Sequence, residues 1–203
     1  MGSVVFTAAE VTEPGVVRHL FGFRLPVGEP SGAKSERAGR LSRVLEQAGF
    51  EAPILDDIRS EIWLKLWGNL CFNPLSALTR GTLKTVATDP GTRAVARAMM
   101  AEAQAVAQRL GATFRIDIER RIDAAASVGD HRTSMLQDLE AGRVLEIDAL
   151  VTAVQEMGRL VGVATPAIDT ILALVQQLGR SLGLYPAYPE LEAPARHAGS
   201  NPQ

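Results

Sequence analysis

The sequence predicts a mainly α-helical protein, in which a bundle-like helical domain follows a few short β-strands. β-type segments are confined to the first 32 positions, whereas apolar residues recur at helical spacing from residue 56 to residue 184. Pairs of a capping residue and a proline, typical of helix starts, occur at Asp89-Pro90 and Thr165-Pro166. The expected loops are short, and no repeat of fixed period indicates a solenoid.

The composition is that of a globular protein, since 46% of the 203 residues are hydrophobic and 22% are charged. A formal net charge of -2 provides no overall field to attract nucleic acid or an anionic membrane. The single cysteine, Cys71, excludes a disulfide within the chain, and three histidines far apart in sequence argue against a metal site. No apolar run could span a bilayer and residues 1–10 do not resemble a secretory signal, so we expect a cytoplasmic protein.

Short strands are expected in residues 1–32. Val4-Val5-Phe6 is a β-type run, Glu13-Pro14-Gly15 is a turn signal, and residues 16–27 form a second apolar stretch. Two or three short strands cannot bury a core by themselves. They therefore need a sheet that the rest of the chain does not provide.

Helices are expected through most of the remaining chain. For the first of them, Ser35 is a predicted N-cap and Gly49 a predicted C-cap glycine. Residues 186–203 contain four prolines among small and polar residues, which predicts a flexible tail. The expected helices cover about 35–49, 56–79, 89–110, 117–128, a short segment from 133 or 134, 146–162 and 165–178.

A polar stripe crosses the long apolar helix expected over residues 56–79. Lys65, Asn69 and Asn73 are spaced by four residues, and each such step turns only about 40° around a helix, so they share one face. Pro74 would kink or loosen the helix beside this stripe. Two interpretations stay open. Either Lys65 reaches solvent and the asparagines bond to backbone, or the stripe lines a functional cavity.

A second polar cluster spans residues 131–138 and continues at Glu146. Thr133 and Ser134 are both natural N-caps, and a carboxylate at Glu146 would be favoured by the dipole of the following helix. Caps and surface pairs therefore explain these residues structurally. The functional alternative is that Glu146 meets Lys65 across a cleft, where it would hold the ammonium and set its pKa.

Three linked blocks of the sequence resemble the helical C-terminal domain of the ketopantoate reductase (2-dehydropantoate 2-reductase) family. The order and the separation of these blocks are those of the family, and the resemblance covers about residues 4–185. It implies three units: remnant strands of a cofactor-binding domain (1–32), a helical domain of the ketopantoate reductase type (33–185) and the tail (186–203). The blocks are residues 57–79 with the run Asn73-Pro74-Leu75-Ser76-Ala77-Leu78-Thr79, then Thr133-Ser134-Met135-Leu136-Gln137-Asp138, then Glu146-Ile147-Asp148.

The resemblance implies an oxidoreductase that reduces 2-dehydropantoate, a small 2-keto acid, to pantoate with NADPH in pantothenate and coenzyme A biosynthesis. It also implies a homodimer. Lys65 matches the family's catalytic lysine, which would protonate the ketone oxygen. Asn69, Asn73 and Ser134 match substrate-binding residues. Glu146 matches a carboxylate near both the lysine and the cofactor, and so a catalytic and cofactor-binding residue.

One part of the family pattern is missing. The phosphate-binding turn Gly-x-Gly-x-x-Gly is absent, because no two of the 18 glycines are separated by a single residue. We therefore expect a family member that starts late, whose first residues resemble the last strands of the cofactor domain. Three functions stay open: the helical part of the reductase, a truncated non-catalytic module for dimerisation, or a relative that reduces another 2-keto acid.

Overall fold

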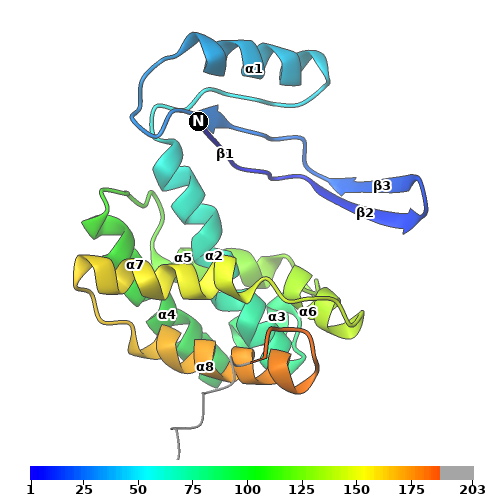
Figure 1. Ribbon diagram of the computed structural model, residues 1–203, viewed down its shortest axis with the longest axis vertical. Helices are drawn as coiled ribbons and strands as arrows, with labels where there is room; N and C mark the ends of the chain where they lie inside the picture. Colours follow the sequence, from blue (N-terminus) through cyan, green and yellow to red (C-terminus); the bar gives the residue numbers. More distant parts are fainter. Residues whose placement is uncertain (188–203) are drawn as a thin grey trace, which may run out of the picture.

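The computed structural model describes residues 1–187 and confirms the mainly α-helical fold. Figure 1 shows a helical body at the bottom and, above it, a strand region that carries one helix. Almost all of the tail expected over residues 186–203 lies outside the described residues. No helix within residues 1–187 is both long and apolar enough to cross a bilayer.

The strands form two separate antiparallel pairs. β1 (Gly2–Ser3) pairs with β4 (Val27–Gly28), and β2 (Ala8–Glu13) pairs with β3 (Val16–Phe21) around the predicted turn. The expected strand at Val4-Val5-Phe6 is instead an extended connection, with only alternate backbone N–H groups bonded to the neighbouring segment. The β2–β3 hairpin projects away from the body in Figure 1, and every side chain of β3 is exposed.

The first helix, α1 (Glu36–Gln47), begins at the predicted cap: Ser35 Oγ accepts the N–H of Ala38 at 3.2 Å. It packs against β4, and Ser42 Oγ donates to the carbonyl of Ala52 at 2.7 Å. α1 therefore sits with the strand region (Figure 1), although the expected domain division assigns it to the helical domain. That division at residue 33 stays a prediction.

The helical body is built around α2 and continues to the end of the described chain. Asp89 caps α4 as predicted, by accepting the backbone N–H three residues ahead. Asp57 and Asp117, at the expected starts of two other helices, cap them in the same way. α3 was not predicted, because it is too short to show an apolar period. The helix expected over residues 146–162 begins with a π-helical turn, η1, and continues as α7. The elements of the body are α2 (Ile58–Thr79), α3 (Leu83–Thr88), α4 (Pro90–Arg109), α5 (Ile118–Ser127), α6 (Ser134–Glu140), η1 (Asp148–Thr152), α7 (Ala153–Val161) and α8 (Pro166–Ser181).

The start of α8 is capped from another helix. Thr165 does not cap it, because its hydroxyl instead donates to Asp169 Oδ1 at 3.0 Å. The carboxylate of Glu102, on α4, accepts the N–H groups of Ala167 and Ile168 at 2.8 and 2.9 Å. The Thr165-Pro166 pair thus marks the correct helix start, but the hydrogen bonds that complete it are tertiary.

The core surrounds α2, which runs through Pro74 to Thr79. Trp67 is fully buried, its indole N–H donates to the carbonyl of Met100 at 2.7 Å, and its ring lies 4.5 Å from that of Phe114. A helix that is apolar on nearly all sides is expected to be buried in this way. The few polar residues of α2 consequently stand out.

One of these polar residues, Glu61, joins the strand region to the helical body. Its carboxylate is only 3% exposed. It accepts a hydrogen bond from Arg24 Nη1 at 2.9 Å and pairs with Arg115, which lies between α4 and α5. Both parts of the molecule therefore share this buried carboxylate.

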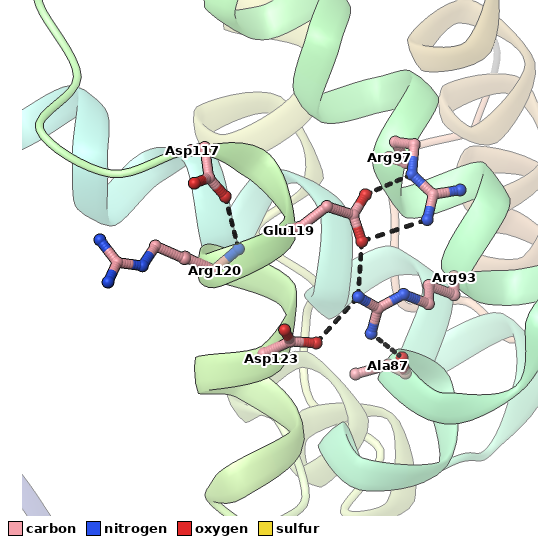
Figure 2. A network of polar contacts seen from close by, with 7 residues as sticks. All are labelled: Ala87, Arg93, Arg97, Asp117, Glu119, Arg120 and Asp123. Atoms are coloured by element: carbon pink, nitrogen blue, oxygen red, sulfur yellow. Dashed lines mark hydrogen bonds and ion pairs between the residues drawn. The ribbon is translucent and has the colours of Figure 1, made fainter.

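A polar network joins α4 to α5 (Figure 2). Arg93 donates to Glu119 at 2.6 Å and to Asp123 at 2.8 Å, and Arg97 also donates to Glu119. Arg93 further donates to the carbonyl of Ala87 on α3 at 3.1 Å. Hydrogen bonds from the two arginines hold the pKa of Glu119 at about 2. Each of these charges therefore finds its partner within the protein.

Candidate active site

A cavity of about 370 Å³ lies between the strand region and the helical body. One wall is residues 5–8 of the strand region together with Phe21 at the base of the hairpin, and the others are α2, α5 and the start of α6. Lys65, Asn69 and Asn73 all contribute to its lining. The stripe predicted from spacing is therefore the α2 wall of this cavity.

Lys65 is half-buried and held at the edge of the cavity by the strand region. Its ammonium donates to the backbone carbonyl of Val5 and lies 5.5 Å from the ring centroid of Phe6. Burial lowers the pKa of Lys65, because the charged form loses hydration there. The ammonium of Lys65 is therefore a stronger acid than that of a lysine in water.

Asn73 and Ser134 meet across the cavity lining. Asn73 is buried, and its Nδ2 donates to Ser134 Oγ at 3.3 Å. Thr133 is the N-cap of α6, since its hydroxyl accepts the N–H of Leu136 at 3.2 Å. Of the two possible caps, Thr133 takes the structural role and leaves the Ser134 hydroxyl on the cavity. Asn69 is half-buried on the same lining, and its side chain forms no hydrogen bond within residues 1–187.

Glu146 does not meet Lys65. It is exposed, does not line the cavity and forms no hydrogen bond or ion pair with a described residue. Its neighbours Leu145 and Ile147 are both buried, so the chain turns the side chain between them outward. The expected pairing across the cleft is therefore absent, and the catalytic and cofactor-binding roles of Glu146 stay predictions.

Three residues of the cavity were not identified from the sequence. Arg121, on α5, lines the cavity beside Gly68 of α2, and a Cβ atom at Gly68 would overlap Arg121 Nη2. Thr7 presents a buried hydroxyl that has no hydrogen-bond partner among the described residues. A lone glycine inside a long helix was the available signal, because such a residue often marks a close approach.

The lining of the cavity is positively charged. It contains Lys65 and Arg121 and no aspartate or glutamate. No group of three or more metal-ligating side chains occurs in the described part of the chain. The cavity therefore combines two cationic side chains with amide and hydroxyl groups, a set that suits a small anionic ligand rich in oxygen.

Residues 57–179, more than half of the chain, match the family described as "Ketopantoate reductase PanE/ApbA C terminal". The chain belongs to the ketopantoate reductase family. It is 58% identical over 185 residues to a 2-dehydropantoate 2-reductase of Mesorhizobium japonicum, covering 91% of this chain and 57% of that protein. It is 32% identical over 163 residues to a 2-dehydropantoate 2-reductase of Archaeoglobus fulgidus, covering 80% of this chain and 55% of that protein.

Solved structures of the ketopantoate reductase family share this fold. The crystal structure of 2-dehydropantoate 2-reductase from Geobacter metallireducens GS-15 superposes with a TM-score of 0.80 at 31% sequence identity. The matched region covers 87% of this chain and 60% of that one. The chain thus spans somewhat more than half the length of the ketopantoate reductases that it matches.

Proposed function

We propose that this chain supplies the substrate cavity and the proton-donating lysine of an oxidoreductase that reduces 2-dehydropantoate to pantoate with NADPH. The observation that carries the proposal is the cavity itself, whose lining contains Lys65, Asn69, Asn73 and Ser134. The 58% identity to a 2-dehydropantoate 2-reductase supports the choice of substrate. A substrate with a ketone, a carboxylate and a hydroxyl group suits these donors and acceptors.

In this proposal Lys65 acts on the ketone oxygen. Reduction of a ketone places negative charge on that oxygen, and a nearby ammonium stabilises the charge and then gives up its proton. Burial lowers the pKa of Lys65, which makes this transfer easier. Asn69 and Asn73 would bind the substrate from the same face of α2, and Ser134 would do so from α6.

The described residues contain no glycine-rich turn for the pyrophosphate of NADPH. A dinucleotide-binding fold holds the pyrophosphate on a glycine-rich turn between a strand and a helix of a parallel sheet. Residues 1–187 contain two antiparallel strand pairs and no such turn. The proposal therefore assigns the pyrophosphate of NADPH no contacts within this part of the chain, and the cofactor contact of Glu146 stays a prediction.

NADPH oxidation in the presence of 2-dehydropantoate tests the proposal, and it is measured as the loss of NADPH absorbance. We would assay the chain alone and a chimaera in which it is joined to the part of the Mesorhizobium japonicum relative outside the matched region. We expect turnover by the chimaera, with the relative itself as the positive control. A folded chimaera that binds NADPH and yet does not consume it with 2-dehydropantoate would contradict the proposal.

Two finer points belong to the same proposal. A panel of other 2-keto acids in that assay would show whether 2-dehydropantoate is the preferred substrate. A homodimer is the expected assembly, and the exposed apolar side chains of the hairpin, including Val11, Val17 and Phe21, favour an additional contact there. Light scattering on the purified chain measures this directly, and a monomer at every concentration would count against it.

A further inference from the structure

Arg121 is a charged residue of the cavity whose guanidinium has no polar partner among residues 1–187. Its side chain is half-buried on α5, and it forms no hydrogen bond or ion pair with any of the residues 1–187. The Cys71 thiol lies close to it, and burial raises the pKa of that thiol, so the thiol carries no charge to balance the guanidinium. Burial also lowers the pKa of Arg121, as expected for a cation that has lost water and gained no anion.

We infer that Arg121 binds the carboxylate of the substrate while Lys65 faces the ketone oxygen of the same molecule. This inference rests on the proposed function and adds to it the residue that recognises the acid group. A buried unpaired charge is costly, and an arriving carboxylate removes that cost because a guanidinium pairs with it through two parallel hydrogen bonds.

Lys65 and Arg121 reach the cavity within about one turn of α2. Arg121 packs over Gly68, which lies three residues after Lys65 on α2, a rise of about 4.5 Å along the helix axis. In a 2-keto acid the carboxylate is bonded directly to the ketone carbon, so the two oxygen groups are neighbours. One small molecule can therefore reach both side chains. No lining carboxylate competes for either cation.

Gly68 is the residue that makes this arrangement possible. A side chain at this position would occupy the place of the Arg121 guanidinium. Because the obstructed group is the mobile end of an arginine, Gly68→Ala is expected to displace Arg121 and to leave α2 intact. The variant thus removes the guanidinium from its place without removing it from the sequence.

Binding to the full chain, measured by isothermal titration calorimetry, tests the inference with three probes. These are 2-dehydropantoate, its lactone (which keeps the ketone but has no free carboxylate) and inorganic phosphate. We expect Arg121→Gln to weaken binding of the acid by about 10- to 100-fold and to leave binding of the lactone unchanged. Gly68→Ala should reproduce this selective loss, and Arg121→Lys should recover part of it.

The matched control is Arg120→Gln. Arg120 is the neighbouring arginine on α5, it is exposed, and it does not line the cavity, yet the substitution changes the net charge equally (Figure 2). It should leave the affinity for the acid unchanged. An equal loss in the Arg120 and Arg121 variants would overturn the inference, since it would reflect general charge.

The remaining outcomes separate the inference from the proposed function. In one outcome the unaltered chain binds the acid, and Arg121→Gln weakens the binding of acid and lactone equally. In that case Arg121 does not bind the carboxylate, and only the inference fails. If Arg121→Gln weakens phosphate but not the acid, the site belongs to a phosphate and the inference again fails alone. If the unaltered chain does not bind the acid at all, the proposed function fails and the inference fails with it.

Discussion

Both faces of α5 carry charged side chains, but only the face towards α4 pairs them with other described residues. Glu119 and Asp123 face α4, where Arg93 and Arg97 satisfy both carboxylates (Figure 2). Arg121 lies on the cavity face of the same helix and has no partner within residues 1–187. Charges that pair with one another account for the packing of α4 on α5. An unpaired cation in a cavity has no such structural explanation, and it therefore points to a ligand.

The largest expected effect is a fall in kcat when the ammonium of Lys65 is removed. In the chimaera, Lys65→Met is expected to lower kcat by about 100-fold or more, because the proton donor at the ketone oxygen is removed. The melting temperature should hardly change, since the substitution keeps the bulk of the side chain. Activity and thermal unfolding would be measured on the same sample. Parallel losses of activity and stability would return Lys65 to a structural role.

A smaller effect is expected at Asn73. Asn73→Ala should raise KM for 2-dehydropantoate by about tenfold, the worth of a hydrogen bond or two to the substrate. Ser76→Ala is the matched control: Ser76 is buried on the same helix, but its hydroxyl donates to the carbonyl of Gly81 at 2.5 Å, away from the cavity. The control should lower stability and leave KM unchanged. A similar KM for both variants would contradict a role of Asn73 in substrate binding.

The pH dependence of kcat should report the buried lysine of the cavity. Burial lowers the pKa of Lys65, so its protonated form is lost below the usual range of a lysine. The kcat of the chimaera is therefore expected to fall on the alkaline side, earlier than an exposed lysine would allow. The same shift means that the fold gains stability as pH rises past this pKa, because the buried group becomes neutral. A pH profile of kcat without such a fall would contradict the role of Lys65 as proton donor.

The smallest effect is expected in the network between α4 and α5. The pKa of Glu119 is held at about 2, below its ordinary value of 4.5, so its pairing stabilises the fold above pH 4.5 and is lost as pH falls towards 2. Glu119→Gln should lower the melting temperature by about 2 °C at neutral pH, because exposed ion pairs contribute little. This difference should shrink in acid. Binding of 2-dehydropantoate should not change. A change would show that the network between α4 and α5 also affects the cavity.

Local signals made much of the fold predictable. Three helices are capped by an aspartate that accepts the backbone N–H three residues ahead, an interaction that is local in the sequence. These caps are Asp57, Asp89 and Asp117. The stripe of Lys65, Asn69 and Asn73 was equally predictable, because a single helix carries it. In each case the determining interaction or spacing lies within one element.

Features set by tertiary contacts were missed. Glu102 caps α8 from a helix more than sixty residues earlier in the chain. Arg121 and Thr7 approach the stripe from two other elements, and no spacing relates them to it. The outward direction of Glu146 depends on the burial of its two neighbours rather than on its own preference for a helix start. Such facts follow from packing, which a one-dimensional pattern does not contain.

The carboxylate of Glu61 has a practical consequence for anyone who wishes to divide the molecule. A truncated protein beginning at residue 57 would keep α2 and Arg115 but lose Arg24, leaving a buried anion with half of its counter-ions. It would also lose residues 5–8, which form one wall of the cavity. The helices are therefore a poor choice for excision as a minimal unit, and screening of inhibitors should keep the strands attached.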